Sequence, residues 1–137
     1  ISADGALVGK VTEVGRALSK PKGAGSAARI WLENDGDSSD QINASARWLG
    51  NSRYAMIGDT KVVHVIGKRA VEAHDECRAG QIIVTTVDKN LTGDCLLFDP
   101  DRLRQLGSLM IMPDGTMHSA QELAGQRLWT GGAAPMR

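Results

Sequence analysis

Residues 76–112 read ECRAGQIIVTTVDKNLTGDCLLFDPDRLRQLGSLMIM, and this stretch decides the fold because its apolar blocks and turn signals agree. The block at 81–87 is rich in β-branched side chains, with Gly80 before it and a polar run at 88–90 after it. Such a block predicts a strand rather than a helix. Its apolar side chains show no in-out alternation, so we expect the strand to be buried on both faces.

A second strand and a helix follow. The short apolar run at 95–98 predicts the strand. Asp99 then supplies a side-chain acceptor for the first free N–H groups of a helix, and Pro100 occupies the position where its missing N–H costs nothing. The sequence therefore predicts a helix over 100–106 that ends at Gly107.

A third strand is expected at 109–112, closed by the turn signal Pro113-Asp114-Gly115. The alternation of strands and helices is typical of an α/β fold with parallel strands covered by helices. We therefore expect a mixed β-sheet with flanking helices. The chain of 137 residues is long enough for one such domain over 1–137 and too short for two.

The rest of the chain carries weaker signals. Ser38 with Gln41 forms a capping box, which predicts the start of a helix whose apolar face holds Ile42, Ala46 and Leu49. The expected elements outside the central stretch are a pair of short strands within 6–18, a loop over 20–28, a brief strand or helix turn at 29–32, a helix over 38–49, a polar connection over 51–59, a strand over 60–66 and a helix over 69–78.

Composition narrows the classes of function. Sixteen basic and sixteen acidic residues cancel, so net charge gives no reason to expect tight binding to nucleic acid or to acidic lipid. No stretch approaches the eighteen or so apolar residues of a membrane span. The chain begins at Ile1 without Met, and we expect it to be a piece of a longer protein.

Patterns for metal binding and catalysis are weak. His64, His74 and His118 lie far apart without ligand-spaced partners, so we expect strand or surface residues rather than a zinc site. The acidic cluster at 33–40 lacks the glycine and glutamate spacing of a calcium loop. No nucleophile motif of the type GxSxG occurs. The residues predict no cofactor.

Four short motifs, taken in order, carry a resemblance to a known family. They are WLENDGD from Trp31, ECRAGQIIVTTV from Glu76, CLLFDPDRLRQLGSLMIM from Cys95 and GQRLWT ending at Thr130. In order and spacing they resemble the C-terminal soluble domain of ComEC-type DNA-internalisation competence proteins of alphaproteobacteria. The motif positions whose role the resemblance leaves open are Trp31, Asp35, Asp37, Asp99 and Trp129.

The resemblance implies a fold like the C-terminal half of a metallo-β-lactamase, with Asp37 near the position of a metal-bridging aspartate. The histidine motifs of catalytic members are missing, which implies a non-catalytic domain without metal. It also implies an inner-membrane parent protein, a domain on the periplasmic side, and contact with the transmembrane part of the same protein. Weak binding of single-stranded DNA and homodimer formation are further expected partners. A metal-dependent nuclease with ligands upstream of Ile1, and a self-association module, remain as alternatives.

Cys77 and Cys95 are the two cysteines of the chain. Cys77 precedes the strand at 81–87 and Cys95 begins the next strand, so in parallel strands both lie at the same edge of the sheet. We expect a disulfide between them, because that edge brings their Cα atoms within bonding range. A pair of buried free thiols remains the alternative.

Overall fold

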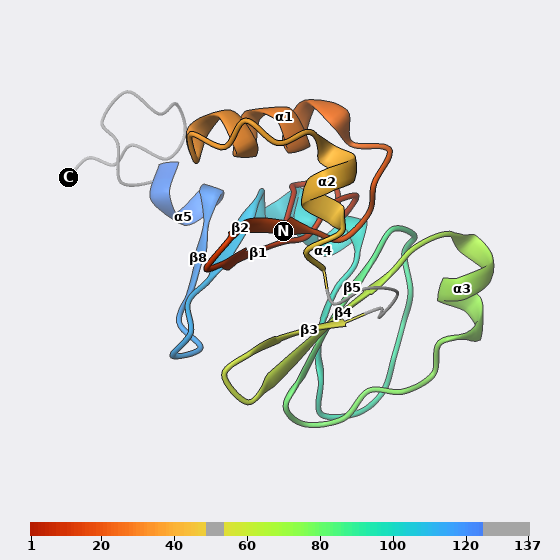
Figure 1. Ribbon diagram of the computed structural model, residues 1–137. Helices are drawn as coiled ribbons and strands as arrows, with labels where there is room; N and C mark the ends of the chain where they lie inside the picture. Colours follow the sequence, from red (N-terminus) through yellow and green to blue (C-terminus); the bar gives the residue numbers. More distant parts are fainter. Residues whose placement is uncertain (49–53, 125–137) are drawn as a thin grey trace.

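A four-stranded sheet lies at the centre of the structure, a computed structural model that describes residues 1–48 and 54–124 (Figure 1). Its strands, in spatial order, are β3 (Tyr54–Ile57), β4 (Thr60–Val65), β5 (Gln81–Thr85) and β6 (Leu96–Phe98). The pair β3–β4 is antiparallel, whereas β4–β5 and β5–β6 are parallel. The structure is therefore mixed α/β with a mixed sheet, as predicted at this level.

Strand β5 is buried on both faces, which confirms the prediction for the central stretch. Ile82 and Val84 pack into one apolar cluster, whereas Ile83 between them packs into another. Successive side chains of a strand point to opposite faces, so both faces of β5 need apolar residues. Val87, which we assigned to the same strand, lies beyond its end and is 36% exposed.

Helices α3 (Lys68–Ala73) and α4 (Pro100–Leu106) cover opposite faces of the sheet. Val71 of α3 packs on the Ile83 side and Leu103 of α4 packs on the Val84 side. Helix α4 has the predicted bounds. The predicted helix over 69–78 was too long, because the backbone is already extended at His74 and Val71 is the side chain that α3 buries.

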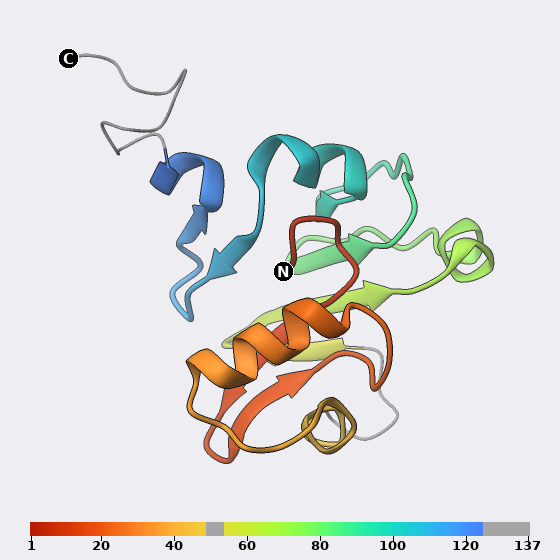
Figure 2. The same cartoon turned by 90° about the horizontal axis from the view of Figure 1, so that it is seen from above.

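The N-terminal part forms a layer above the sheet. Strands β1 (Gly9–Thr12) and β2 (Gly15–Leu18) pair antiparallel, which confirms the two short strands predicted there. This hairpin packs on the sheet through Ala17 and on helix α1 (Gly25–Asn34) through Leu18. Figure 2 shows α1 lying across the hairpin, with the short helix α2 (Gln41–Ser45) beside it.

Helix α1 corrects the prediction of a loop over 20–28 followed by a strand or single turn. The helix begins at Gly25 and runs for 10 residues. Glycine and serine near its start suggested a loop, but Ala28 and Leu32 are buried against Leu7 and Leu18. Tertiary burial of one apolar face therefore outweighs the local preference for a loop.

Helix α2 is shorter than predicted and has a different cap. Asp40, rather than Ser38, accepts a hydrogen bond from the N–H of Asn43 at 2.8 Å. Gln41 donates instead to the carbonyl of Gly23, 2.8 Å away, so the capping box does not form. Ala44 is buried and Ile42 is 57% exposed, which is the reverse of the predicted apolar face. Leu49 lies outside the described residues.

The sequence did not predict β3 or the strand at 117–119. Residues 51–59 were assigned to a polar connection, but β3 lies within them and pairs with β4 through the hairpin turn at Gly58. The third strand of the central stretch, β7 (Leu109–Ile111), does not join the parallel sheet. It pairs antiparallel with β8 (Met117–Ser119), which precedes α5 (Ala120–Ala124).

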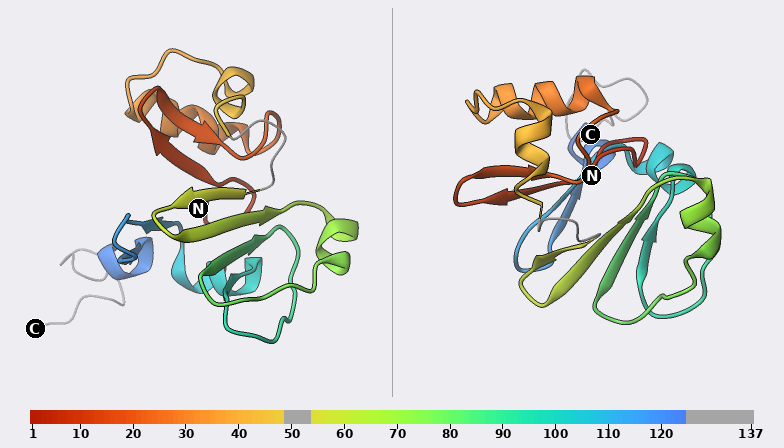
Figure 3. Two further views of the ribbon diagram at one scale, coloured as in Figure 1. Left: turned by 60° about the horizontal axis from the view of Figure 1, so that its bottom comes forward. Right: turned by 45° about the vertical axis from the view of Figure 1, so that its right-hand side comes forward.

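The turn at 113–115 explains the placement of β7. The N–H of Met112 donates to the carbonyl of Thr116 at 2.8 Å, and Asp114 accepts from the N–H of Thr116 at 2.9 Å. The turn sends the chain straight back, so β7 finds a local antiparallel partner. Both views in Figure 3 show the hairpins β1–β2, β3–β4 and β7–β8 on the side of the molecule away from α3.

Candidate functional site

Asp35 of the WLENDGD motif holds an arginine against Trp31. The Nε and Nη2 atoms of Arg16, on β2, donate to the two carboxylate oxygens of Asp35 at 2.7 and 2.9 Å. The hydrogen bonds from Arg16 lower the pKa of Asp35. The guanidinium carbon lies 5.4 Å from the centre of the Trp31 ring, a cation–π arrangement. These motif residues therefore join α1 to the hairpin below it.

Asp37 of the same motif binds a second arginine. Nη1 of Arg47 donates to Oδ2 of Asp37 at 2.6 Å and to the carbonyl of Arg16 at 3.1 Å. The N–H of Ser39 donates to Oδ1 at 2.9 Å. These bonds, that of Arg47 above all, hold the pKa of Asp37 well below its usual range. Side chains beside Gly15 leave no room for a Cβ there, and its φ of +123° suits glycine.

The predicted motif positions thus separate into two places. Trp31, Asp35 and Asp37 come together at α1 and β2, whereas Asp99 caps α4 and Trp129 lies outside the described residues. The sequence did not indicate Arg16 or Arg47, because neither arginine is near its aspartate in the chain. Within residues 1–48 and 54–124, no three His, Cys, Asp or Glu side chains form a group able to hold a metal ion.

We expect the change Asp99→Ala to destabilise the protein by about 1 kcal/mol. The Oδ1 atom of Asp99 accepts from the N–H of Arg102 at 2.9 Å, and Oδ2 accepts from the N–H of Lys89 at 3.3 Å. Chemical denaturation measures the loss. Asp101→Ala is the matched control, since its exposed side chain pairs with Arg104 and is expected to contribute less than about 0.5 kcal/mol. Equal effects of the two changes would contradict a capping role.

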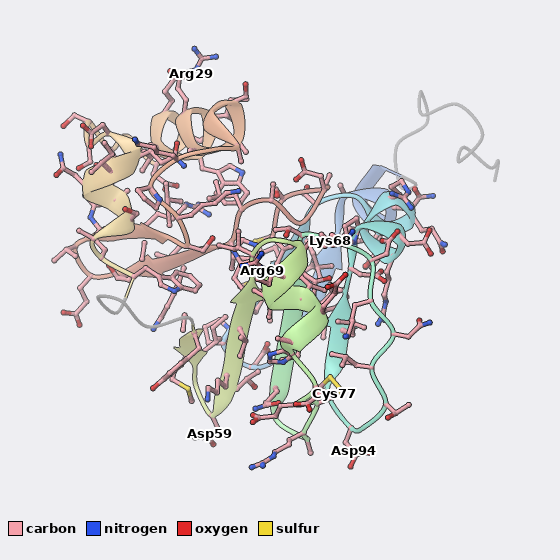
Figure 4. The ribbon with its side chains drawn as sticks, turned by 90° about the vertical axis from the view of Figure 1, so that its right-hand side faces the viewer. Arg29, Asp59, Lys68, Arg69, Cys77 and Asp94 are labelled. Carbon is pink, nitrogen blue, oxygen red and sulfur yellow. A yellow bond between two sulfur atoms is a disulfide. The ribbon has the colours of Figure 1, made fainter. Side chains whose placement is uncertain are left out.

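Cys77 and Cys95 form a disulfide in the structure, with their Cα atoms 4.8 Å apart. The bond joins the loop before β5 to the residue before β6, at the shared edge where parallel strands begin (Figure 4). The N–H of Asp94 also donates to the carbonyl of Cys77 at 3.1 Å. Gly93 is required beside it, because a Cβ at that position would overlap the Cys77 carbonyl.

A groove of about 750 Å³ opens between the three hairpins. One wall holds Val11 on β1 and Val8 just before this strand, and β3 contributes Met56 and Ile57. The third wall comes from the β7–β8 hairpin, from residues 108–113 and His118. Trp31 and Arg16 also line the groove, so the WLENDGD motif supports one of its walls.

Exposed methionines make the groove a solvent-facing apolar surface rather than part of the core. Met56, Met110 and Met112 are 37%, 53% and 39% exposed, and Val11 is 71% exposed. Methionine is flexible and polarisable, so such a surface adapts to different apolar partners. One wall of the groove could have been indicated by the sequence, because Met110 and Met112 share a face in an extended chain. The other walls depend on distant segments.

The polar side chains along the groove are basic or neutral. Lys10, Arg16, His118 and Ser108 line it, and no Asp or Glu does so among the described residues. Arg16 already pairs with Asp35, whereas the salt bridges within the described chain do not include Lys10. A cationic group beside apolar walls favours an occupant that carries negative charge at one end.

His64 forms a separate polar network beneath the N-terminal loop. It is 4% exposed, with Nε2 lying 2.8 Å from the carbonyl of Gly5 and Nδ1 lying 2.7 Å from the Ser19 hydroxyl. A carbonyl can accept but not donate, so Nε2 carries the hydrogen and Nδ1 accepts from Ser19. Burial lowers the pKa of His64 to about 4. This buried histidine joins β4 to the start of the chain and has no access to a substrate.

Comparisons with protein-family models, with curated proteins and with solved structures find no match for this chain. None of the helices in its described part is long and apolar enough to span a membrane.

Proposed function

We propose that this chain is a non-catalytic binding domain of a competence-type DNA-uptake channel in the inner membrane. The order of the WLENDGD, ECRAGQIIVTTV and CLLFDPDRLRQLGSLMIM motifs supports the family, in the degenerate metallo-β-lactamase-like form. In this proposal the domain docks on the transmembrane part of its own parent protein. A homodimer through the same surface, or a pure self-association module, is the competing form of the binding role.

The groove is the observation that carries the binding role. Its walls join apolar side chains from three hairpins, and several of these side chains are well exposed. A contiguous exposed apolar surface with polar groups at its border is a typical protein interaction site. Its volume also lies within the roughly 300 to 1,000 Å³ range of ligand sites.

The motif carboxylates support a binding role rather than hydrolysis. Asp35 and Asp37 are bound by Arg16 and Arg47, and together they fix α1 against β2. A catalytic metal needs carboxylates free to coordinate it. In the nuclease alternative, the ligands would have to come from other parts of the parent protein.

The disulfide supports a periplasmic location. Disulfides form and persist in oxidising compartments, of which the bacterial periplasm is one. Cys77 and Cys95 are bonded at an edge of the sheet where both residues are half-buried. A domain on the periplasmic side of an inner-membrane channel would meet those conditions.

Contact with single-stranded DNA is a weak and salt-dependent part of the proposal. Lys68 and Arg69 begin α3, at the opposite end of β4 from Lys61 (Figure 4). The ammonium of Lys61 lies 4.3 Å from the centre of the Tyr54 ring, and that of Lys89 donates to the carbonyl of Glu72 at 3.2 Å. Basic residues separated in this way can neutralise few phosphates together.

We expect the groove variant Met110→Glu, placed in the parent protein of a naturally transformable host, to lower transformation frequency at least about tenfold. A carboxylate there costs desolvation energy whenever an apolar partner covers it, and a loss of about 1.4 kcal/mol in docking gives this factor. Ile42→Glu is the matched control, because Ile42 is equally exposed but lies outside the groove. Unchanged transformation by a stably expressed Met110→Glu protein would refute the proposed function.

A further inference from the structure

Three strand edges meet around the groove. In the described part of the chain, β1 pairs with β2 alone, β3 with β4 alone, and β7 with β8 alone. Each of these three edge strands contributes residues to the groove, and β3 is one of the two edges of the four-stranded sheet. The unpaired backbone groups of an edge strand are a template for pairing with another chain.

The open edge of β7 is already partly paired with the N-terminus of the chain. The N–H of Leu109 donates to the carbonyl of Ile1 at 2.9 Å, and the amino group of Ile1 donates to the carbonyl of Leu109 at 2.8 Å. Of these three strands, β1 and β3 are therefore the two left for an incoming chain within the described residues. Both are 4 residues long, which in an extended conformation corresponds to about 13 Å of strand.

Side chains from these edges fit an extended segment. Val11 on β1 and Met56 on β3 are exposed, and Met110 and Met112 project from the facing hairpin. An added strand would place alternate side chains between these walls while its backbone pairs with the edge. Lys10, also on β1, lines the groove and takes part in none of the salt bridges of the described chain, so its ammonium group would favour an acidic residue in the segment.

We propose that the groove binds an extended polypeptide segment of its docking partner, with alternating apolar side chains and an acidic residue beside Lys10, as a strand added to β1 or β3. Main-chain hydrogen bonds supply affinity in this mode of recognition, and the side-chain pockets supply specificity. The inference rests on the proposed binding role, and it names the chemistry of the partner: an acidic, apolar strand rather than an amphipathic helix.

The test uses a displayed library of random dodecamer peptides, selected against this chain in its oxidised form. We expect selected peptides to alternate apolar and polar residues and to carry Asp or Glu at one end. A synthetic peptide of the consensus sequence should bind the Lys10→Glu variant at least about tenfold more weakly, and a charge-reversed peptide should recover binding to that variant. The change Met110→Glu should weaken the binding of both the consensus and the charge-reversed peptide. The change Ile42→Glu should leave the binding of both peptides unchanged.

Hydrogen exchange of the bound complex gives the second measurement. New amide protection within 9–12 or 54–57 is expected for strand addition, because these residues form β1 and β3. The inference would be overturned by any of four results: no selected peptide, a consensus with helical spacing, amide protection outside these two strands, or self-association of the chain that blocks the groove. If peptides bind as expected but Met110→Glu leaves transformation unchanged, strand addition in the groove is supported and the proposed role in DNA uptake is refuted. If Met110→Glu lowers transformation but no peptide binds as a strand, the inference of strand addition is refuted and the proposed function is not.

Discussion

The double change Cys77→Ala, Cys95→Ala is expected to lower the free energy of unfolding by about 3 kcal/mol. The bond joins residues 18 positions apart, and it removes conformations from the unfolded chain in proportion to the logarithm of that loop length. It also holds together the starts of β5 and β6, which pair in parallel. Denaturant unfolding of oxidised wild-type and variant protein measures the difference.

Reduced wild-type protein is the control for this change. It keeps both sulfur atoms but lacks the bond, so its stability should fall to within about 1 kcal/mol of the double variant. A reduced protein as stable as the oxidised one would show that the cross-link contributes little. A stable reduced protein beside an unstable variant would assign the loss to side-chain packing.

Stability is also expected to fall by about 3 kcal/mol between pH 6.5 and pH 4 because of His64. The pKa of its imidazole is lowered by burial from 6.5 to about 4 in the folded protein. Between pH 6.5 and pH 4, the His64 imidazole binds a proton in the unfolded chain but stays neutral in the folded chain. The contribution of neutral His64 to the free energy of unfolding is thus complete above pH 6.5, decreases as the pH falls, and is lost by pH 4.

The network around His64 gives the structural reason. A proton on Nδ1 would turn this atom into a donor that faces the Ser19 hydroxyl, which already accepts from the N–H of Val8 at 3.0 Å. The charges of Lys20 and of the N-terminus also disfavour a second positive charge here. Charging the ring therefore opposes the contacts that hold residues 1–8 on β4.

Two measurements check this prediction. Unfolding free energies of wild-type protein and of His64→Gln, compared from pH 7 to pH 4, should show the extra decline in wild-type protein alone. Groups common to both proteins cancel in this difference. NMR titration of the His64 ring in the folded wild-type protein needs no variant, and a midpoint near 6.5 would contradict the expected value.

The strongest local signals placed the central elements correctly. Asp99, Pro100 and Gly107 define α4 through capping and backbone geometry, which depend on neighbours within a few residues. The β-branched block around Ile83 likewise predicted the buried strand β5 and the edge at which Cys77 and Cys95 lie together. These features follow from the order of residue types over short distances.

The candidate site was only partly predictable. Trp31, Asp35 and Asp37 were indicated by the motif they form, but their arginine partners are remote in sequence: Arg16 lies 19 positions from Asp35, and Arg47 lies 10 from Asp37. Ion pairs of this kind carry no periodic signal. The groove walls come from hairpins spread over the whole described chain, so exposed Met56 and Met110 could not be related to each other from sequence.

The sequence by itself determined the parallel centre, the capped helix α4 and the cysteine pair, because local capping, β-branched blocks and strand order are sufficient for them. Tertiary structure decided where α1 begins, that Asp40 rather than Ser38 caps α2, and that β7 pairs with β8 instead of the sheet. In each of these places the local sequence signals are compatible with more than one structure. Burial of Ala28 and Ala44 against Leu7 and Leu18, and the tight turn at 113–115, select between them.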